Sequence, residues 1–358
     1  MLKEGYSSIE NIQSVIQKNP YTSNWLTVKE DRTDFIVLEA NPLYWNHKRR
    51  PEIKKIVFRN DLTQNQALHY CMDREGEVDI VTEVSPEYAL RVQSSKYAKL
   101  VFNGGDRIVT GIFNRFQEDV RFSDRRLRLA FNYAINQEEI IREAFHGYAE
   151  AVPAFTPPWA VDFPQELKPI SYNPSKANQL FNEVKWPDER PLRIVTPEIY
   201  QSVATMIAAQ LKEAFGVSIK LNILSGRDEL RWRRVLAEKK LIPNWDLFIG
   251  SPSAFFYEGT PAFFHRECLG ADGVLRASPV LPEFEKVYQA MARETNQRAF
   301  IERAKEVDRF VHNEALALFL CAPYKLYAVN KNVDFRPYRT TFELVDTKVC
   351  RGHWSRNV

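Results

Sequence analysis

The stretch from Leu192 to Leu224 constrains the fold more strongly than any other part of this sequence. It begins with an apolar strand pattern, LRIVT, and continues with helical spacing of apolar residues from Gln201 to Phe215. Gly216 then ends the helix, and a second strand pattern, VSIKLNIL, follows. A strand, a helix and a strand in this order predict a βαβ unit, so the chain is expected to have an α/β fold.

Strand and helix patterns alternate along the rest of the chain as well. Ser123–Ile135 is predicted to be a helix capped by Ser123, and Asn136 is predicted to cap the next helix, which ends near Gly147. The prolines of segment 151–169 predict an extended, irregular course, because proline fixes φ and removes a hydrogen-bond donor. Further helices are expected at residues 63–72, 173–184, 227–239, 282–294 and 296–313, and further strands at residues 34–39, 53–58, 78–81, 100–102, 108–113, 245–250, 317–320 and 326–330.

Composition and charge exclude several classes of partner. The 358 residues are 44% hydrophobic and 27% charged, which is enough apolar material for a core and enough length for two lobes. Lys and Arg total 49 against 46 Asp and Glu, and a net charge of +3 gives no general attraction for nucleic acid or an anionic membrane. Short basic runs at residues 125–128 and 231–234 have acidic neighbours and are interpreted as solvated helix faces. No nucleic-acid partner is therefore expected.

The residues that usually carry chemistry are scattered along the chain. Four cysteines stand far apart without a CxxC pair, so no disulfide framework is indicated, and Cys321 is predicted to be a small buried hydrophobe. His265 with Cys268, and His69 with Cys71, are closely spaced, but a zinc site needs three or four convergent ligands. The sequence has no GxSxG, P-loop or GxGxxG motif. We therefore expect neither an enzyme nor a bound metal or cofactor.

Several longer stretches follow one another in an order typical of one protein family. FIVLEANPLYW, IKKIVFR and GEVDIV come first, and GIFNRFQEDVRFSDRRLRLAFNYAINQEEIIREAFHGYAEAV comes next. YNPSKANQLFNE, KEAFGVSIKL and ERAKEVDRFVHNEALALFLCAPYKLYAVNKNVDFRPY complete the series. Together they resemble the extracellular solute-binding proteins of ABC importers, in the peptide/nickel-binding family (family 5). The resemblance covers almost the whole chain.

The resemblance implies an α/β fold of the two-lobed periplasmic-binding-protein type, class II-like. Lobe I would comprise residues 1–110 with 323–358, lobe II would comprise 111–322, and hinge strands would lie near 109–114 and 322–329. Family members carry a signal sequence, the first strands of one lobe and a small extra domain before the point where this sequence starts. The expectation is therefore an N-terminally truncated chain in which the first part of lobe I is missing.

The same resemblance implies a transport function without covalent chemistry. The protein would be a monomer that captures a small ligand (a peptide, an opine-like conjugate or a metal chelate) between its lobes and delivers it to an ABC permease in the inner membrane. The alternatives are a cytoplasmic ligand-sensing domain of a transcription regulator and a truncated, non-functional remnant. The family resemblance favours the periplasm, although the first residues lack the basic start and apolar stretch of a secretory signal.

The candidate ligand-binding residues lie in three places. One is the end of the strand near residue 113, one is the loop that follows strand 192–196, and one is the loop that follows Gly250. Loops at the carboxyl ends of strands are where α/β folds place ligands. The candidates are Asn114, Glu198, Tyr200, Gln201, Ser251, Phe255, Tyr257 and Glu258, with Trp159 as a weaker one.

Several of these assignments have a competing structural interpretation. The Asn114 amide could instead bond to backbone and brace the strand end. Dipeptide-binding relatives carry a cationic side chain near Gln201, and this chain has none there. Glu258 stands where peptide-binding relatives place an Asp that pairs with the ligand's amino group. Phe255 and Tyr257 could stack on a ligand or pack under the loop.

Overall fold

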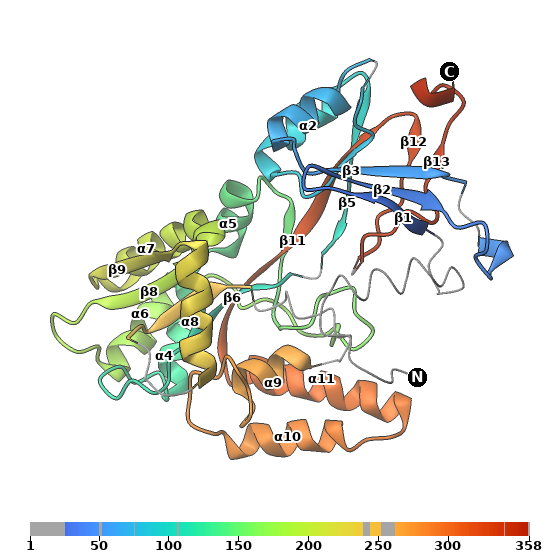
Figure 1. Cartoon of the computed structure of the whole chain (residues 1–358). Coiled ribbons are helices and arrows are strands. Elements are labelled where there is room, and N and C mark those ends of the chain that lie inside the picture. Colours follow the sequence, from blue (N-terminus) through green and yellow to red (C-terminus); the bar gives the residue numbers. More distant parts are fainter. Residues whose placement is uncertain are drawn as a thin grey trace. The chain divides into compact units, whose positions relative to one another are not determined.

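The chain crosses twice between two units. The computed structural model describes residues 26–49, 52–74, 76–105, 107–238, 244–251, 262–339 and 341–356. Unit 1 consists of Met1–Asn103 with Lys325–Val358, and unit 2 consists of Gly104–Tyr324 (Figure 1). The lobes expected from the sequence have boundaries near these crossings, and their identity as lobes stays a prediction.

Unit 2 is built on a mixed sheet. Its strands are β6 (Val109–Phe113), β7 (Ala149–Ala151), β8 (Leu192–Pro197), β9 (Ile219–Leu224), β10 (Leu247–Gly250) and the first part of β11 (Ala317–Asn330). The strand order is β11-β6-β10-β8-β9, with β7 added along β11. Strands β8, β9 and β10 are mutually parallel, whereas β6 runs antiparallel to β10 and β11.

The predicted βαβ unit is confirmed. Helix α7 (Gln201–Phe215) connects β8 to β9, and the two strands pair in parallel with Leu192 opposite Ile219. Gly216 ends α7 in the left-handed conformation, with φ of 67°, which glycine adopts without a steric penalty from Cβ. The α/β fold class predicted from this stretch is therefore correct.

Side chains of the central strands point alternately to two apolar layers. Ile194 and Leu247 belong to one buried cluster, whereas their chain neighbours Val195 and Phe248 belong to another. This alternation is the two-residue period of a strand whose two faces are both covered. The first cluster is completed by α4 (Arg125–Ala134), α5 (Gln137–Ala144), α6 (Pro174–Val184) and α7. The second is completed by α8 (Gly226–Glu238), α9 (Phe263–Leu269), α10 (Pro282–Ala292) and α11 (Gln297–Asn313).

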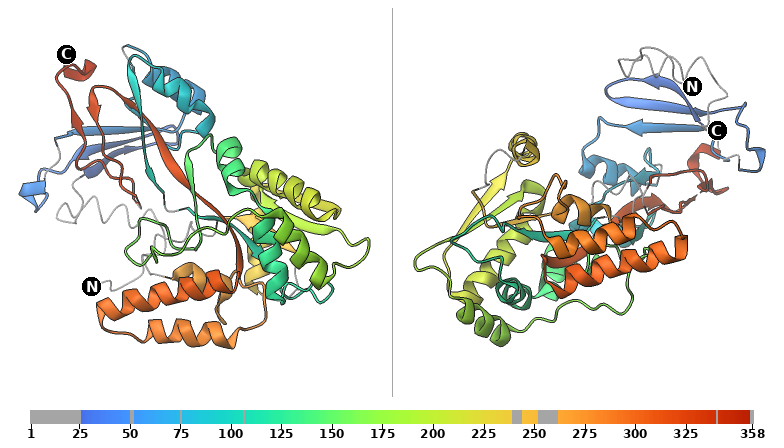
Figure 2. Two further views of the ribbon diagram at one scale, coloured as in Figure 1. Left: turned by 180° about the vertical axis from the view of Figure 1, so that it is seen from behind. Right: turned by 90° about the horizontal axis from the view of Figure 1, so that it is seen from below.

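The two faces of the sheet carry different helix arrangements. Helices α10 and α11 run side by side as a long pair, as both views of Figure 2 show. Their apolar faces include Phe284 and Val307, both 0% exposed. Because buried residues recur at helical spacing here, both helices could be predicted from the sequence. The short helix α9 was not expected, since its sequence, FFHRECL, shows no clean helical stripe.

Two details of the predicted elements need correction. Asp124, not Ser123, caps α4, because its carboxylate accepts a hydrogen bond from Arg126 N at 2.9 Å. The strands expected at 317–320 and 326–330 form the single strand β11, because residues 321–323 pair with β7 and leave no break. The predicted cap Asn136 is confirmed, and α5 ends before Gly147.

Unit 1 contains smaller elements. An antiparallel sheet is formed by β1 (Leu26–Asp31), β2 (Phe35–Ala40) and β3 (Lys55–Arg59). The second part of β11 pairs with β4 (Ile80–Val81), and β5 (Ala98–Gly104) also pairs with β11. Helix α2 (Gln64–Cys71), within the helix expected at residues 63–72, buries Leu68 and Cys71. The remaining elements are α3 (Ala89–Gln93), β12 (Val333–Asp334) and β13 (Lys348–Val349), with 3-10 turns at His47–Arg49, Pro86–Tyr88 and Trp354–Arg356.

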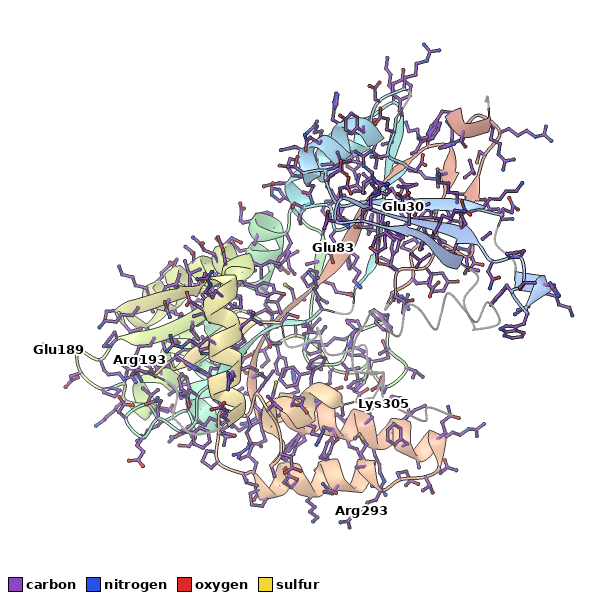
Figure 3. All side chains as sticks on the ribbon, in the orientation of Figure 1. Glu30, Glu83, Glu189, Arg193, Arg293 and Lys305 are labelled. Carbon is purple, nitrogen blue, oxygen red and sulfur yellow. The ribbon has the colours of Figure 1, made fainter. Side chains whose placement is uncertain are left out.

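A buried carboxylate locks the amino ends of β8 and β10. Asp246 is 0% exposed, and its Oδ1 lies 2.8 Å from Arg190 Nη2 and 2.9 Å from Arg193 Nη2. Arg193 projects from β8 (Figure 3), and its backbone N–H also donates to Asp246 Oδ2 at 2.7 Å. Arg190 pairs in addition with Asp119 at 2.8 Å. Burial lowers the pKa of Arg190, but its hydrogen bonds to Asp246 and Asp119 raise that pKa overall, so this arginine stays charged.

We expect Asp246→Asn to lower the free energy of unfolding by about 3 kcal/mol, because two guanidinium groups lose their buried counter-charge. The same change at Asp119, whose side chain is 53% exposed, is expected to cost less than about 1 kcal/mol. Urea denaturation of the two variants and the native protein measures both losses. Equal losses would contradict the view that the buried carboxylate carries the stability of this network.

A second polar group is buried in the layer of α9 and α11. His265 and Asp308 are 1% and 0% exposed, and His265 Nε2 lies 2.6 Å from Asp308 Oδ1. Asp162, in the proline-rich segment, is 7% exposed, and Phe155 of that segment packs its ring 5.2 Å from the His265 ring. Burial raises the pKa of Asp162, and the negative charge of Asp308 raises it further. His265 on α9 and Lys305 on α11 (Figure 3) lower this pKa and so oppose the rise.

The Asp162 carboxyl should therefore make stability depend on pH. Its pKa is higher in the folded protein than in the unfolded chain, so its ionisation costs stability as the pH rises. We expect Asp162→Asn to melt at a higher temperature than the native protein near pH 7, with a difference that shrinks toward about pH 4. Calorimetry checks this, and Asp272→Asn, an exposed site, is the control. A variant that is less stable than the native protein near pH 7 would overturn the assignment.

Candidate functional site

The carboxyl edge of the parallel strands in unit 2 gathers exposed polar side chains. Strands β8 and β10 are parallel, so their carboxyl ends lie at the same edge of the sheet (Figure 1). Thr196, the last-but-one residue of β8, donates its hydroxyl to Ile249 O at 3.0 Å and so joins the two strand ends. In an α/β sheet this edge is the usual place for a ligand.

Four of the predicted site residues follow these two strand ends. After β8 the chain forms a short 3-10 turn, Glu198–Tyr200, and then begins α7 at Gln201. Glu198 and Gln201 are exposed, Tyr200 is half-buried against the first apolar cluster, and Ser251, directly after β10, is half-buried. Because Phe248 pairs with Val195, Ser251 and Glu198 each lie three residues farther along neighbouring strands. The structure therefore places Glu198 and Ser251 at one edge of the sheet.

Helix α7 contributes the positive end of its dipole at the same edge. Its N-cap, Tyr200, makes no capping hydrogen bond with its side chain, and no acidic residue lies in the first turn of the helix. The helix continues directly from the 3-10 turn Glu198–Tyr200, and the Gln201 N–H already donates to Glu198 O. This edge therefore combines exposed carboxylate and amide side chains with the positive end of a helix dipole, which favours a carboxylate or another polar oxygen.

Asn114 lies at the opposite edge of the sheet. Since β6 is antiparallel to β10, the carboxyl end of β6 is next to the amino end of β10. Asn114 is buried, its Nδ2 donates to Trp245 O at 2.7 Å, and its Oδ1 accepts from Phe116 N at 3.1 Å. These are the bonds that the bracing interpretation predicts. Among the described candidates, Glu198, Gln201 and Ser251 lie at the other edge, away from Asn114.

The remaining four candidates lie in two other segments of the chain. Phe255, Tyr257 and Glu258 lie outside the residues that the structure describes, so their roles stay predictions. Trp159 is held in unit 2, where its Nε1 donates to Gly105 O at 2.8 Å. Thr196 was not among the candidates predicted from the sequence. Its only signal is a hydroxyl residue at the end of an otherwise apolar strand pattern.

The two closely spaced histidine–cysteine pairs form no metal centre in the described part of the chain. His265 pairs with Asp308, and Cys268 is 1% exposed on the same helix. Across the described ranges, no three or more His, Cys, Asp or Glu side chains are grouped so that they could hold a metal ion. Burial raises the pKa of the Cys268 and Cys321 thiols, so neither is a ready nucleophile, and Cys321 is buried as predicted. Of the described helices, none has the length and apolar character required to cross a membrane.

Known proteins resemble this chain in sequence. A sequence model of bacterial extracellular solute-binding proteins, family 5 (middle region), matches residues 16–266. The glutathione-binding protein GsiB of Salmonella choleraesuis is 28% identical over 158 residues, which are 44% of this chain and 30% of that protein. GsiB of Escherichia coli K12 is 27% identical over the same shares of both chains. The matched region thus spans 30% of the length of these curated relatives.

Solved structures share the fold. The ABC transporter substrate-binding protein CtaP of Listeria monocytogenes aligns with a TM-score of 0.78 and 19% identity, covering 97% of this chain and 70% of that one. The periplasmic binding protein DppA of Helicobacter pylori, solved with the peptide STSA, aligns with a TM-score of 0.68 and 17% identity, covering 95% and 67%. These neighbours confirm the predicted two-lobed periplasmic-binding-protein fold class. Because the family model matches most of the chain, this protein belongs to the bacterial extracellular solute-binding proteins of family 5.

Proposed function

We propose that this protein is the solute-binding component of an ABC importer, which captures a small ligand and delivers it to a permease in the inner membrane. The family match over residues 16–266 carries this proposal. We further propose that it acts in the periplasm as a monomer and catalyses no reaction. GsiB is a glutathione-binding protein and DppA was solved with a peptide, so among peptides, opine-like conjugates and metal chelates we favour short peptides as ligands.

The carboxyl edge of the unit 2 sheet is the proposed ligand-binding site. Its described members are Glu198, Tyr200, Gln201 and Ser251, and Phe255, Tyr257 and Glu258 of the following loop are proposed to join them. The carboxylates of Glu198 and Glu258 would pair with the amino group of a peptide, because opposite charges favour the ionised form of both partners. The positive end of the α7 dipole would favour the ligand's carboxylate in place of a cationic side chain near Gln201.

Capture would proceed by hinge motion of the two units about the chain crossings at 103–104 and 324–325. A ligand shifts this equilibrium only through a difference in its affinity for the open and closed states. The chain's own residues therefore have two tasks, which are to contact the ligand's charged ends and to exclude water from the contact.

Thermal unfolding with a ligand panel tests the function. The panel contains glutathione, peptides of two to four residues, opine-like conjugates, oligosaccharides and nickel–histidine chelates. At a ligand concentration of about 100 times Kd, binding to the native state adds about 2.7 kcal/mol of stability, so a specific peptide should raise the melting temperature clearly. If the protein unfolds cooperatively and no member of the panel raises its melting temperature, the proposed ligand classes are wrong.

Charge-neutral variants test the site. For a peptide found in the panel, we expect Glu198→Gln and Glu258→Gln each to weaken binding about tenfold, equivalent to about 1.4 kcal/mol. An N-acetylated form of the same peptide should not discriminate between native and variant proteins, because it lacks the charged amino group. Isothermal titration calorimetry measures these affinities, with Glu213→Gln, an exposed position on the last turn of α7, as control. Unchanged affinity in both variants would remove these two residues from the site and leave the transport proposal standing.

A further inference from the structure

The chain enters and leaves unit 2 through two neighbouring strands. Strand β5 ends at Gly104, the first residue of unit 2, and β11 passes from Tyr324 to Lys325, where unit 1 resumes. The two strands pair with each other in the sheet. Any motion of one unit against the other must therefore change backbone torsions in these two short stretches, because the chain passes between the units nowhere else.

On the unit 2 side, one segment holds both crossings. Tyr324 N donates to Tyr148 O at 3.0 Å, and the preceding residues of β11 pair with β7, with Pro323 opposite Ala149. Eleven residues after Tyr148 in the chain, Trp159 donates its indole N–H to Gly105 O at 2.8 Å. The segment 148–159 is thus bonded to Tyr324, the last residue before the crossing at 324–325. It is also bonded to Gly105, the second residue after the crossing at 103–104.

The indole of Trp159 also packs on the backbone of the crossing. A Cβ placed on Gly104 would lie 3.0 Å from Trp159 Cδ1, a tight contact that would require the ring to shift by a few tenths of an ångström. The absence of a side chain at residue 104 therefore permits the close approach of the ring. Ring contact and hydrogen bond together fix the course of the chain at Gly104 and Gly105.

The segment that carries Trp159 is itself firmly attached to unit 2. Val152 and Ala154 are 0% exposed, and Val152 N donates to Leu320 O of β11 at 3.3 Å. The Phe155 ring packs 5.8 Å from the Phe319 ring, and His312 Nδ1 donates to Pro153 O at 2.9 Å. These contacts join the segment to β11 and α11. Because the segment is fixed to unit 2 in this way, its bonds to Tyr324 and Gly105 hold the backbone of the crossings in place.

On the unit 1 side, a second segment holds the same two strands. Asn103 Nδ2 donates to Pro337 O at 3.1 Å, and Lys325 Nζ donates to Arg339 O at 3.3 Å. Asn103 and Lys325 are the residues that flank the crossings within unit 1. Each strand is therefore anchored within one or two residues on both sides of its crossing.

We propose that segments 148–159 and 337–339 are two clamps that confine hinge rotation to the peptide links at 103–104 and 324–325, with Trp159 as the positioning residue. The proposal rests on the proposed function only in that solute capture requires the two units to move. The clamps define one axis for that motion, because two neighbouring pivots fixed on both sides allow rotation about the line that joins them. Loss of the Trp159 restraint frees additional backbone torsions at Gly104 and Gly105 and so widens the range of orientations.

Single-molecule energy transfer between dyes on the two units tests this on the full chain without any ligand. The exposed Cys350 is first replaced by Ser, and dyes are attached at Glu87→Cys in unit 1 and Glu213→Cys in unit 2, both exposed positions. Trp159→Phe retains a ring but loses the bond to Gly105 O. The matched control is Trp354→Phe, which loses an indole bond to Asp79 Oδ1 (3.4 Å) in unit 1.

We expect Trp159→Phe to broaden the distribution of transfer efficiencies and to shift its mean, while Trp354→Phe leaves it unchanged. Gly104→Ala should also shift the distribution, because its methyl group displaces the indole, and it decides the matter if Trp159→Phe does not fold. The proposal is overturned if both variants at the crossing give the native distribution, or if Trp354→Phe broadens it equally. Since no ligand is present, failure to find a transported solute would not affect this result.

Discussion

The sheet of unit 2 must be covered on both faces, and most of the unit's architecture follows from that requirement. Neighbouring residues on β8, such as Ile194 and Val195, are 1% and 2% exposed although they point in opposite directions. Burial of a side chain of this size contributes about 1.5–3 kcal/mol, so neither face can be left in water. Helices α4–α7 cover one face and α8–α11 cover the other. The exposed polar groups considered for ligand binding therefore lie at an edge of the sheet, whereas the His265–Asp308 pair is buried in the layer of α9 and α11.

The two edges then differ in how far their polar groups are already satisfied. At the amino edge, Asp246 is bonded to two arginines and Asn114 is bonded to backbone, so these groups hold the strands together. At the carboxyl edge, Glu198 and Gln201 are exposed beside the start of α7, which has no side-chain cap. At the second edge, the Glu198 carboxylate and the positive end of the α7 dipole are the groups proposed to receive the amino group and the carboxylate of a solute. The proposed binding site and the proposed clamps thus have separate structural bases, since the clamps lie where β5 and β11 cross between units.

Much of the fold was predictable because it depends on local patterns. The βαβ unit needed only the change from strand spacing to helix spacing and the glycine at residue 216. The cap Asn136 and the helix beginning at Pro174 also follow from a few adjacent residues. Predictions were less secure where two neighbours compete, as for Ser123 and Asp124, because either side chain can accept the capping hydrogen bond. The separation of β11 into two strands was wrong because its continuity depends on β7, whose residues lie far away in the sequence.

By itself, the sequence determined the α/β class, the order of helices and strands, and the family resemblance, because hydrophobic period and capping residues act over a few residues. Only the tertiary structure decided that Asn114 and Ser251 lie at opposite edges, since strand direction is set by pairing and not by composition. It likewise decided that Trp159 packs on Gly104 and that Asp162 is buried with His265 and Asp308. Such contacts join residues whose neighbourhood arises only when distant segments are folded against one another, and no local pattern in the sequence encodes them.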